Sequence, residues 1–341
     1  MKKFITLSMA LTMALCSLSY GAVINPKQDG NIVKSYTKTD DTNAQCDIIT
    51  AYLNSEDVAE KLTKELTENT KKTDKDVSYE VEGGNIYFNK TTGLITSADN
   101  TVTKVDIPLY IDKVLVVGID DYAFFNCRNL KEVSMKTEPK TIGKKAFAYS
   151  GLKKITLSQK ITTIGESAFA YCPITSLVLT DNINSIGSNA FEQSALTTIT
   201  MPKALTEVPE NCFNGCSALK TIGLNTGVKT VGKNAFKGCS SLLNITIPAN
   251  VETISESAFE DCTKLYNVIF NAGIKYIKPR AFANTTALTS VSYTLTELDG
   301  TSFEGSGLKN VTCYNKNVAS NRTLYPSGVK VKTVAKSYIQ Q

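Results

Sequence analysis

Residues 231–247 read VGKNAFKGCSSLLNITI, and variants of this stretch recur along most of the chain. The phenylalanine of this stretch is one of nine that follow one another at intervals of 21 to 23 residues. These residues are Phe124, Phe147, Phe169, Phe191, Phe213, Phe236, Phe259, Phe282 and Phe303. Self-similarity with a period of about 20 to 50 residues is typical of stacked-repeat architectures, in which each unit contacts only its neighbours. The sequence therefore predicts a solenoid of nine units, each of 22 or 23 residues, over residues 116–313.

Each unit carries the same pattern of apolar residues. The residue five positions before the phenylalanine is aliphatic, as in Val231, and a segment of the form L-x-x-I-x-L follows it, as in residues 242–247. Side chains alternate between the two faces of a strand, so we expect these segments to stack as a parallel sheet, with the phenylalanines in an internal column opposite. Glycine recurs before the Ala-Phe pair and is expected to permit a tight bend there. These glycines are Gly143, Gly165, Gly187 and Gly232.

The spacing between units varies in a regular way. From the leading residue of each L-x-x-I-x-L segment to the next phenylalanine there are 17 residues in seven of eight cases. The exception is the interval from Leu288 to Phe303, which is 15 residues and predicts that two residues are missing near residues 292–297. A constant spacing preserves the register, because a slip of one residue would turn core side chains outward.

The first 21 residues have the pattern of a secretory signal peptide. Lys2 and Lys3 precede an apolar stretch that is too short to span a bilayer, and small residues precede a cleavage site before Ala22. Cys16 leaves a lipoprotein signal as an alternative, although Leu15 stands where such signals usually carry a small residue. No later stretch is long and apolar enough for a membrane helix. We therefore expect export to the cell surface, the extracellular space or the periplasm.

Three further segments flank the predicted array. Residues 22–76 are polar and contain one expected helix, capped by Ser55 and carrying Val58, Leu62 and Leu66 on one face. Residues 77–115 alternate as strands do and predict a small β-hairpin cap that leads into the array. Residues 314–341 are expected to form a C-terminal cap or tail.

The repeat resembles a known family. The unit from Val231 through Cys239, Leu242, Ile245 and Ile247 resembles BspA-like leucine-rich repeats, the phenylalanine-anchored repeats of bacterial surface and secreted proteins. The segment YFNKTTGLIT at residues 87–96, followed by VDIP at 105–108, is similar to the lead-in of such arrays. The resemblance implies a curved, right-handed leucine-rich-repeat solenoid, mainly β, with a non-catalytic role in adhesion or recognition. Exposed positions vary freely in this family, so no ligand residue transfers by motif.

The composition excludes several kinds of chemistry. The chain has no histidine, which excludes a Ser-His-Asp or Cys-His nucleophile and an HExxH zinc site. A net charge of +5 is too small to indicate binding to nucleic acid. No catalytic, cofactor-binding or metal-binding residue is predicted, and we expect a protein that is not an enzyme and needs no cofactor.

Cysteines lie three residues after the phenylalanine in five units, and serine or threonine fills this position in the other four. This exchange favours a small buried corner in which a free thiol packs as an apolar group. A disulfide along the stack remains an alternative for Cys216, Cys239 and Cys262, which fall in consecutive units of an exported protein. A metal site is a further alternative, which the wide spacing of the cysteines and the lack of histidine disfavour.

The outward positions of the L-x-x-I-x-L segments define a candidate ligand face. Small hydroxyl and amide side chains dominate there, which suits a flat polar contact and offers no convergent acid pair for glycoside hydrolysis. The candidate residues are Lys154, Thr156, Thr198, Thr200, Thr221, Asn244, Thr246, Tyr266, Asn267 and Ile269. Tyr266 and Ile269 are the candidates for an apolar patch. The preference of Ser and Thr for strands explains most of these residues equally well.

These observations lead to two hypotheses of function. The first is a monomeric surface or secreted protein, without a membrane span, that recognises a host matrix protein, another cell-surface protein or a glycan. The second is a structural spacer or scaffold of the cell envelope without a specific host ligand. An adhesin should carry a local patch of aromatic or charged side chains on the sheet, whereas a spacer should be uniformly polar.

Overall fold

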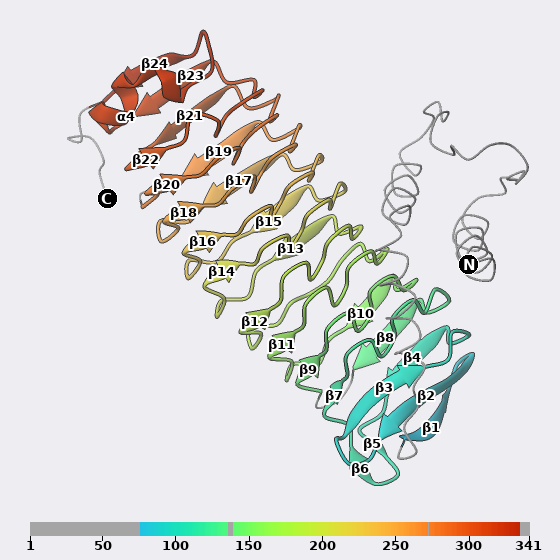
Figure 1. The fold of residues 1–341 in the computed structure, drawn as a ribbon. Coiled ribbons are helices and arrows are strands. Elements are labelled where there is room, and N and C mark those ends of the chain that lie inside the picture. Colours follow the sequence, from blue (N-terminus) through green and yellow to red (C-terminus); the bar gives the residue numbers. More distant parts are fainter. Residues whose placement is uncertain (1–75, 136–138, 272, 335–341) are drawn as a thin grey trace, which may run out of the picture. The chain divides into compact units, whose positions relative to one another are not determined.

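A computed structural model describes residues 76–135, 139–271 and 273–334, which form a solenoid of β-strands and turns (Figure 1). The predicted repeat solenoid with parallel strands is therefore confirmed. The predicted signal peptide, the predicted helix after Ser55 and the last seven residues of the predicted tail lie outside the described residues. We number the coils of the solenoid by their phenylalanines, so that coil 1 contains Phe124 and coil 9 contains Phe303.

An antiparallel meander precedes the array, as the predicted hairpin cap requires. Strands β1 (Asp76–Val81), β2 (Gly84–Asn89) and β3 (Leu94–Ala98) pair in this order. Strand β3 then pairs in parallel with β7 (Gly118–Ile119), and β4 (Lys104–Ile107) pairs in parallel with β8 (Glu132–Met135). The register of the repeats thus already holds at Ile95 and Val105, which lie opposite Ile119 and Val133. A short hairpin of β5 (Tyr110–Ile111) and β6 (Val114–Leu115) lies between β4 and β7 in the chain.

The L-x-x-I-x-L segments form a ladder of parallel strands along one side of the solenoid. After β4 and β8 it comprises β10 (Lys154–Thr156), β13 (Thr198–Thr200), β15 (Thr221–Gly223), β17 (Asn244–Ile247), β19 (Asn267–Phe270), β21 (Ser290–Tyr293) and β23 (Asn310–Cys313). The pairing divides into several sections, and coil 3 contributes only a bridge from Ser176 to Thr198. Between sections, single backbone bonds continue the stack, as where the Leu243 N–H donates to the Lys220 carbonyl (3.2 Å).

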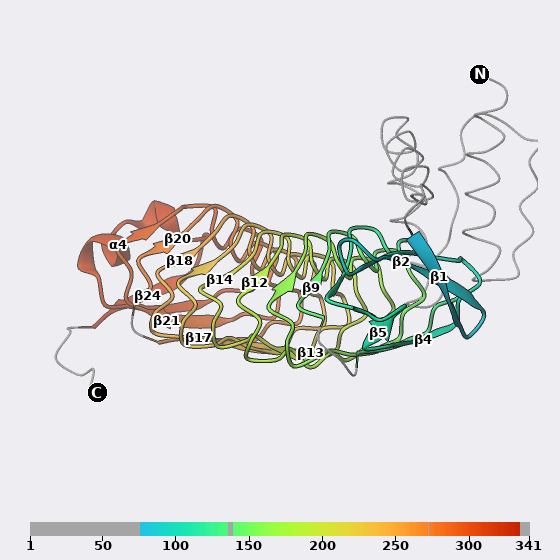
Figure 2. The same ribbon diagram turned by 90° about the horizontal axis from the view of Figure 1, so that it is seen from below.

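A second parallel ladder consists of two-residue strands. They are β7, β9 (Thr141–Ile142), β11 (Thr163–Ile164), β12 (Ser185–Ile186), β14 (Glu207–Val208), β16 (Thr230–Val231), β18 (Thr253–Ile254), β20 (Tyr276–Ile277) and β22 (Glu297–Leu298). The aliphatic residue five positions before each phenylalanine ends one of these strands and is buried. Figure 2 shows the two ladders on different sides of the solenoid.

The phenylalanines form the predicted internal column. All nine rings are fully buried, and successive rings stack with centroids 5.0–5.7 Å apart and planes within 11° of parallel. The phenylalanine N–H of each of the first eight coils donates to the carbonyl of the residue before the next phenylalanine, as from Phe236 to Ala258 (2.8 Å). Since a buried amide must find a partner, this bond explains why the turns stack at a constant interval.

Each turn around a phenylalanine bends through left-handed residues. In coil 6 these are Asn234 (φ 52°) and Gly238 (φ 72°), which lie two residues before and two residues after Phe236. The residue two positions after the phenylalanine has a positive φ in all nine coils, and the residue two positions before it has one in eight. Glycine and asparagine adopt this conformation at the least cost, which explains why asparagine recurs at both positions and glycine at the later one.

The glycines predicted to permit a bend have a different role. Gly165 and Gly232 have no positive φ, so they are not required for a left-handed conformation at this bend. A Cβ atom on Gly165 would lie 2.6 Å from the carbonyl carbon of Gly143, and one on Gly232 would lie 2.6 Å from the Val208 carbonyl oxygen. Glycine is favoured there because the backbones of adjacent coils approach each other closely.

The C-terminal end of the array contains the predicted two-residue deletion. Three residues (294–296) join β21 to β22, whereas five residues (248–252) join β17 to β18. The chain then forms α4 (Lys316–Ser320), the short helix η1 (Arg322–Leu324) and β24 (Lys330–Thr333), which pairs in parallel with β23. Strand β24 thus adds a further rung to the ladder of long strands.

Candidate functional site

The outer face of the long strands is the candidate site, and we call it the long-strand face. Three columns of side chains run along it, one at each x of L-x-x-I-x-L. The first column is Lys131, Lys153, Thr175, Thr197, Lys220, Leu243, Tyr266, Thr289 and Lys309. The second is Glu132, Lys154, Ser176, Thr198, Thr221, Asn244, Asn267, Ser290 and Asn310. The third is Ser134, Thr156, Val178, Thr200, Gly223, Thr246, Ile269, Ser292 and Thr312. The pairing of the strands holds neighbouring members of a column one strand spacing apart.

The structure places all ten candidate residues on this face, and all ten are exposed. Nine belong to the strands β10, β13, β15, β17 and β19, and Tyr266 directly precedes β19. Their side chains contact neighbours along the columns, as where the Thr221 hydroxyl donates to the Thr198 hydroxyl (3.0 Å). The Lys154 ammonium pairs with Glu132 (2.9 Å) in the adjacent coil. The face is therefore a fixed array of small polar groups on a paired backbone.

An apolar cluster interrupts this polar surface. Tyr266 and Ile269 are 56% and 48% exposed, and Leu243, in the first column of the preceding coil, is 36% exposed. The Tyr266 N–H donates to the Leu243 carbonyl (3.0 Å), so these two residues lie side by side in adjacent coils. Sequence reasoning placed Leu242 in the core but missed Leu243, because it took only the second and third columns as the exposed face. We call Leu243, Tyr266 and Ile269 the apolar cluster.

The long-strand face is also basic, which the second and third columns alone do not show. With the end strands β4 and β24 included, it carries eight lysines and two acidic residues, or +6. The lysines are Lys104, Lys131, Lys153, Lys154, Lys220, Lys309, Lys330 and Lys332, and the acids are Asp106 and Glu132. The entire chain carries +5, so the remainder is close to neutral. The lysines of the first column account for most of this charge.

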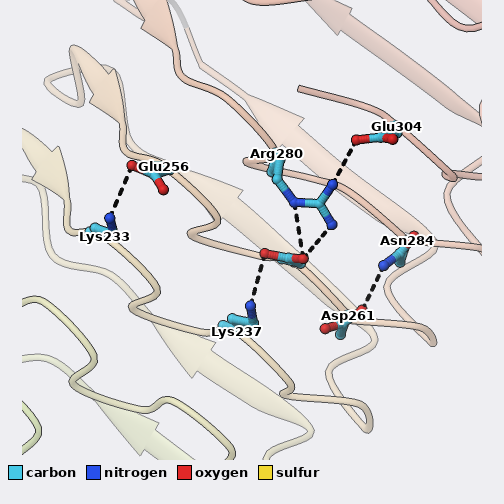
Figure 3. A network of polar contacts seen from close by, with 8 residues as sticks. Lys233, Lys237, Glu256, Asp261, Arg280, Asn284 and Glu304 are labelled. Carbon is cyan, nitrogen blue, oxygen red and sulfur yellow. Dashed lines mark hydrogen bonds and ion pairs between the residues drawn. The ribbon is translucent and has the colours of Figure 1, made fainter. Parts of the chain in front are cut away.

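The side of the turns is different, because acidic and basic residues of successive coils pair there (Figure 3). Lys233 contacts Glu256 at 3.1 Å, and Lys237 contacts Glu260 at 3.1 Å. Arg280 joins two acids, with its guanidinium 2.5 Å from Glu260 and 2.6 Å from Glu304. These contacts bridge coils 6 to 9 and neutralise the surface on which they lie.

Glu260 is the buried member of this network, with a side chain only 7% exposed. Burial opposes its ionisation, but hydrogen bonds from Arg280, Ser257 and Lys237 outweigh that effect and lower its pKa to about 2. The carboxylate is therefore ionised at neutral pH and is held between two cations. It is a structural group, because its oxygens already accept bonds from side chains of the same network.

The cysteines of the repeat are buried free thiols in the described part of the chain. Sulfur donates to the phenylalanine carbonyl of the preceding coil, as from Cys239 to Phe213 (3.2 Å) and from Cys262 to Phe236 (3.1 Å). Serine and threonine fit the same small corner but bond differently, as where the Thr285 hydroxyl donates to the Phe282 carbonyl of its own coil (2.7 Å). Burial raises the pKa of the Cys216 thiol to about 12, which keeps it protonated.

Within residues 76–135, 139–271 and 273–334, no cluster of three or more His, Cys, Asp or Glu side chains could hold a metal ion. Among the same residues, no helix is long and apolar enough to cross a bilayer.

Comparison with known proteins agrees with this architecture. The model of the BspA type leucine-rich repeat region matches residues 117–230 and 184–309, in six copies. A leucine-rich repeat protein from Bacteroides ovatus has a similar structure, with 22% identity, a TM-score of 0.56, and coverage of 77% of this chain and 78% of that one. The pneumococcal vaccine antigen PcpA is 20% identical, with coverage of 73% and 75% and a TM-score of 0.45. No curated protein matches the sequence significantly.

Proposed function

The chain belongs to the BspA-type leucine-rich repeat family, and from that premise we propose that it is a non-catalytic protein that recognises another protein through the long-strand face. The observation that carries the proposal is the apolar cluster on a face where most of the other side chains are polar. Burying an exposed tyrosine and two aliphatic side chains against a partner is favourable, and aromatic residues recur among the side chains that dominate binding energy.

The backbone under the cluster supports this role. The four residues of β17 pair with the four residues of β19, and Val268 and Ile245 fix the strands to the core. A partner therefore meets side chains whose backbone is already ordered, so that little entropy is lost there on binding.

Export is the second part of the proposal. The basic residues, the short apolar stretch and the small residues before Ala22 have the pattern of a secretory signal. We place the protein at the cell surface or outside the cell, where its partner would be a host matrix protein, another surface protein or a glycan-bearing protein. We propose that it acts as an adhesin and as a monomer.

A binding assay with two sets of variants tests the proposal. The full chain is immobilised and incubated in parallel with host matrix and bacterial envelope extracts, and bound proteins are identified by mass spectrometry. The face variant combines Leu243→Ser, Tyr266→Ser and Ile269→Thr. Its control combines Glu207→Ser, Lys229→Ser and Glu297→Ser, which are exposed residues on or beside the ladder of short strands.

We expect a partner that binds the wild-type chain and the control but is lost from the face variant. Equal retention by both variants would refute recognition through this face. The alternative function, a structural spacer of the envelope, is favoured by the small polar groups that fill most of the second and third columns. It predicts no saturable partner in either extract.

A further inference from the structure

The lysines in the later part of the long-strand face have no acidic partner among the residues that the structure describes. From coil 3 to coil 9 and in β24, the three columns contain no aspartate or glutamate. Lys220, Lys309, Lys330 and Lys332 are exposed there. No carboxylate of the described residues lies within 4.0 Å of any of these four ammonium groups.

The geometry of the solenoid makes this lack of partners informative. Residues one repeat apart lie about 4.8 Å from each other across parallel strands, so a lysine and a glutamate in neighbouring coils pair readily. The opposite side of the same coils contains such pairs, for example Lys275 with Glu252 at 3.0 Å and Lys233 with Glu256 at 3.1 Å. From coil 3 onward the long-strand face has the same spacing without the acids, so the lysines there have no carboxylate partner among the described residues.

The order of residues along the first column defines the surface further. From coil 5 to coil 9 it reads Lys220, Leu243, Tyr266, Thr289 and Lys309. Two of the three residues of the apolar cluster thus lie between two unpaired lysines. Four strand spacings separate these lysines, or about 19 Å. An extended chain covers that distance in about six residues, with the first, third, fifth and seventh side chains on one face.

We propose that this part of the long-strand face binds an acidic, extended segment of a partner protein, which runs across the coils. Its carboxylates, about six residues apart, pair with Lys220 and Lys309, and apolar side chains between them cover Leu243 and Tyr266. This inference rests on the proposed function and specifies the chemistry of the partner. The charges orient the partner and speed its association, and burial of the apolar side chains supplies most of the binding energy.

Selection from a library of random peptides tests the chemistry without knowledge of the partner. Phage displaying peptides about 12 residues long, twice the expected contact, are selected on the immobilised full chain. We expect the enriched peptides to be acidic, with an aromatic or aliphatic residue between two carboxylates about six residues apart. A sulfated oligosaccharide, added as a competitor, separates a peptide site from a general anion site.

Binding of the enriched peptides is then compared between two charge variants. Lys220→Glu with Lys309→Glu reverses the two lysines, and Lys140→Glu with Lys229→Glu makes the same change in net charge beside the short strands. We expect the first variant, and a rise in NaCl from about 0.05 M to about 0.5 M, to weaken binding about tenfold or more. The second variant should bind as the wild type does.

The outcomes separate this inference from the proposed function. Peptides that depend on the apolar cluster but bind the Lys220 and Lys309 variant normally would overturn the acidic partner and keep the face as a recognition surface. Selection that yields no peptide dependent on these two lysines overturns the inference, as does binding of the sulfated oligosaccharide alone. Circular dichroism of both variants confirms that each is folded.

Discussion

Replacing Glu260 by glutamine tests whether the buried ion network stabilises coils 6 to 9. The carboxylate lies between Lys237 and Arg280, and only 7% of its side chain is exposed. Glutamine keeps the shape and the hydrogen bonding of the protonated acid and removes the charge. The substitution therefore measures what ionisation of this group contributes to folding.

The size of the effect follows from the shifted pKa. The pKa of Glu260 falls from an ordinary value of 4.5 to about 2, and each unit corresponds to about 1.4 kcal/mol. The ionised carboxylate thus contributes about 3 kcal/mol to the free energy of unfolding at neutral pH. Because the folded-state pKa is lowered, this contribution is complete above about pH 4.5 and is lost as the pH falls towards 2.

Urea unfolding of the wild type and of Glu260→Gln, followed by circular dichroism from pH 7 to about pH 2, measures this difference. The control is Glu256→Gln, because Glu256 forms a cross-coil pair of the same length with Lys233 but is half exposed. We expect the control to lose less than about 1 kcal/mol, since exposed ion pairs contribute little. Equal losses for the two variants, or a loss for Glu260→Gln that does not change with pH, would refute the argument.

Three other outcomes follow from the repeat. Phe236→Ala should destabilise the chain by about 3–5 kcal/mol in urea unfolding, because it empties a fully buried ring position between two stacked neighbours. Cys239→Ser should keep the bond to the Phe213 carbonyl and unfold near the wild-type midpoint, whereas Cys239→Ala should lose about 1 kcal/mol or more; a larger loss for serine would contradict this role. Asn234→Gly should be neutral and Asn234→Ala destabilising by about 1 kcal/mol, since φ is 52° there; thermal melts of the two variants decide it.

The core was predictable because the repeat determines it. Each coil buries its apolar side only against the next coil, so the same residue types must return at the same interval. The period therefore located Phe236, the strands around it and the two-residue deletion before β22. The role of Gly232 was not predictable, because the distance between two backbones in adjacent coils is not a local property of the sequence.

The surface was less predictable for a related reason. Leu243 and Lys220 belong to the first column, which lies at the bend before the strand, where alternation alone does not say which way a side chain points. The structure shows that the side chains of Leu243 and Lys220 are both exposed. The network around Glu260 depends on three coils at once, and no spacing within a single unit indicates it. The ten candidate residues of the ligand face are exposed as expected, and their role in binding stays a prediction.

The hydrogen bonds that stack the coils run in two opposite directions. At the turns, the phenylalanine N–H donates forward to the next coil, as from Phe147 to Ala168. Beside the ladders, many bonds run backward from a later coil to an earlier one, as from Gly165 to Ile142. Peptide dipoles along the axis therefore oppose one another, whereas in an α-helix they all add. Each added coil brings peptide dipoles of both directions, so lengthening the stack builds up less charge at its ends than lengthening an α-helix does.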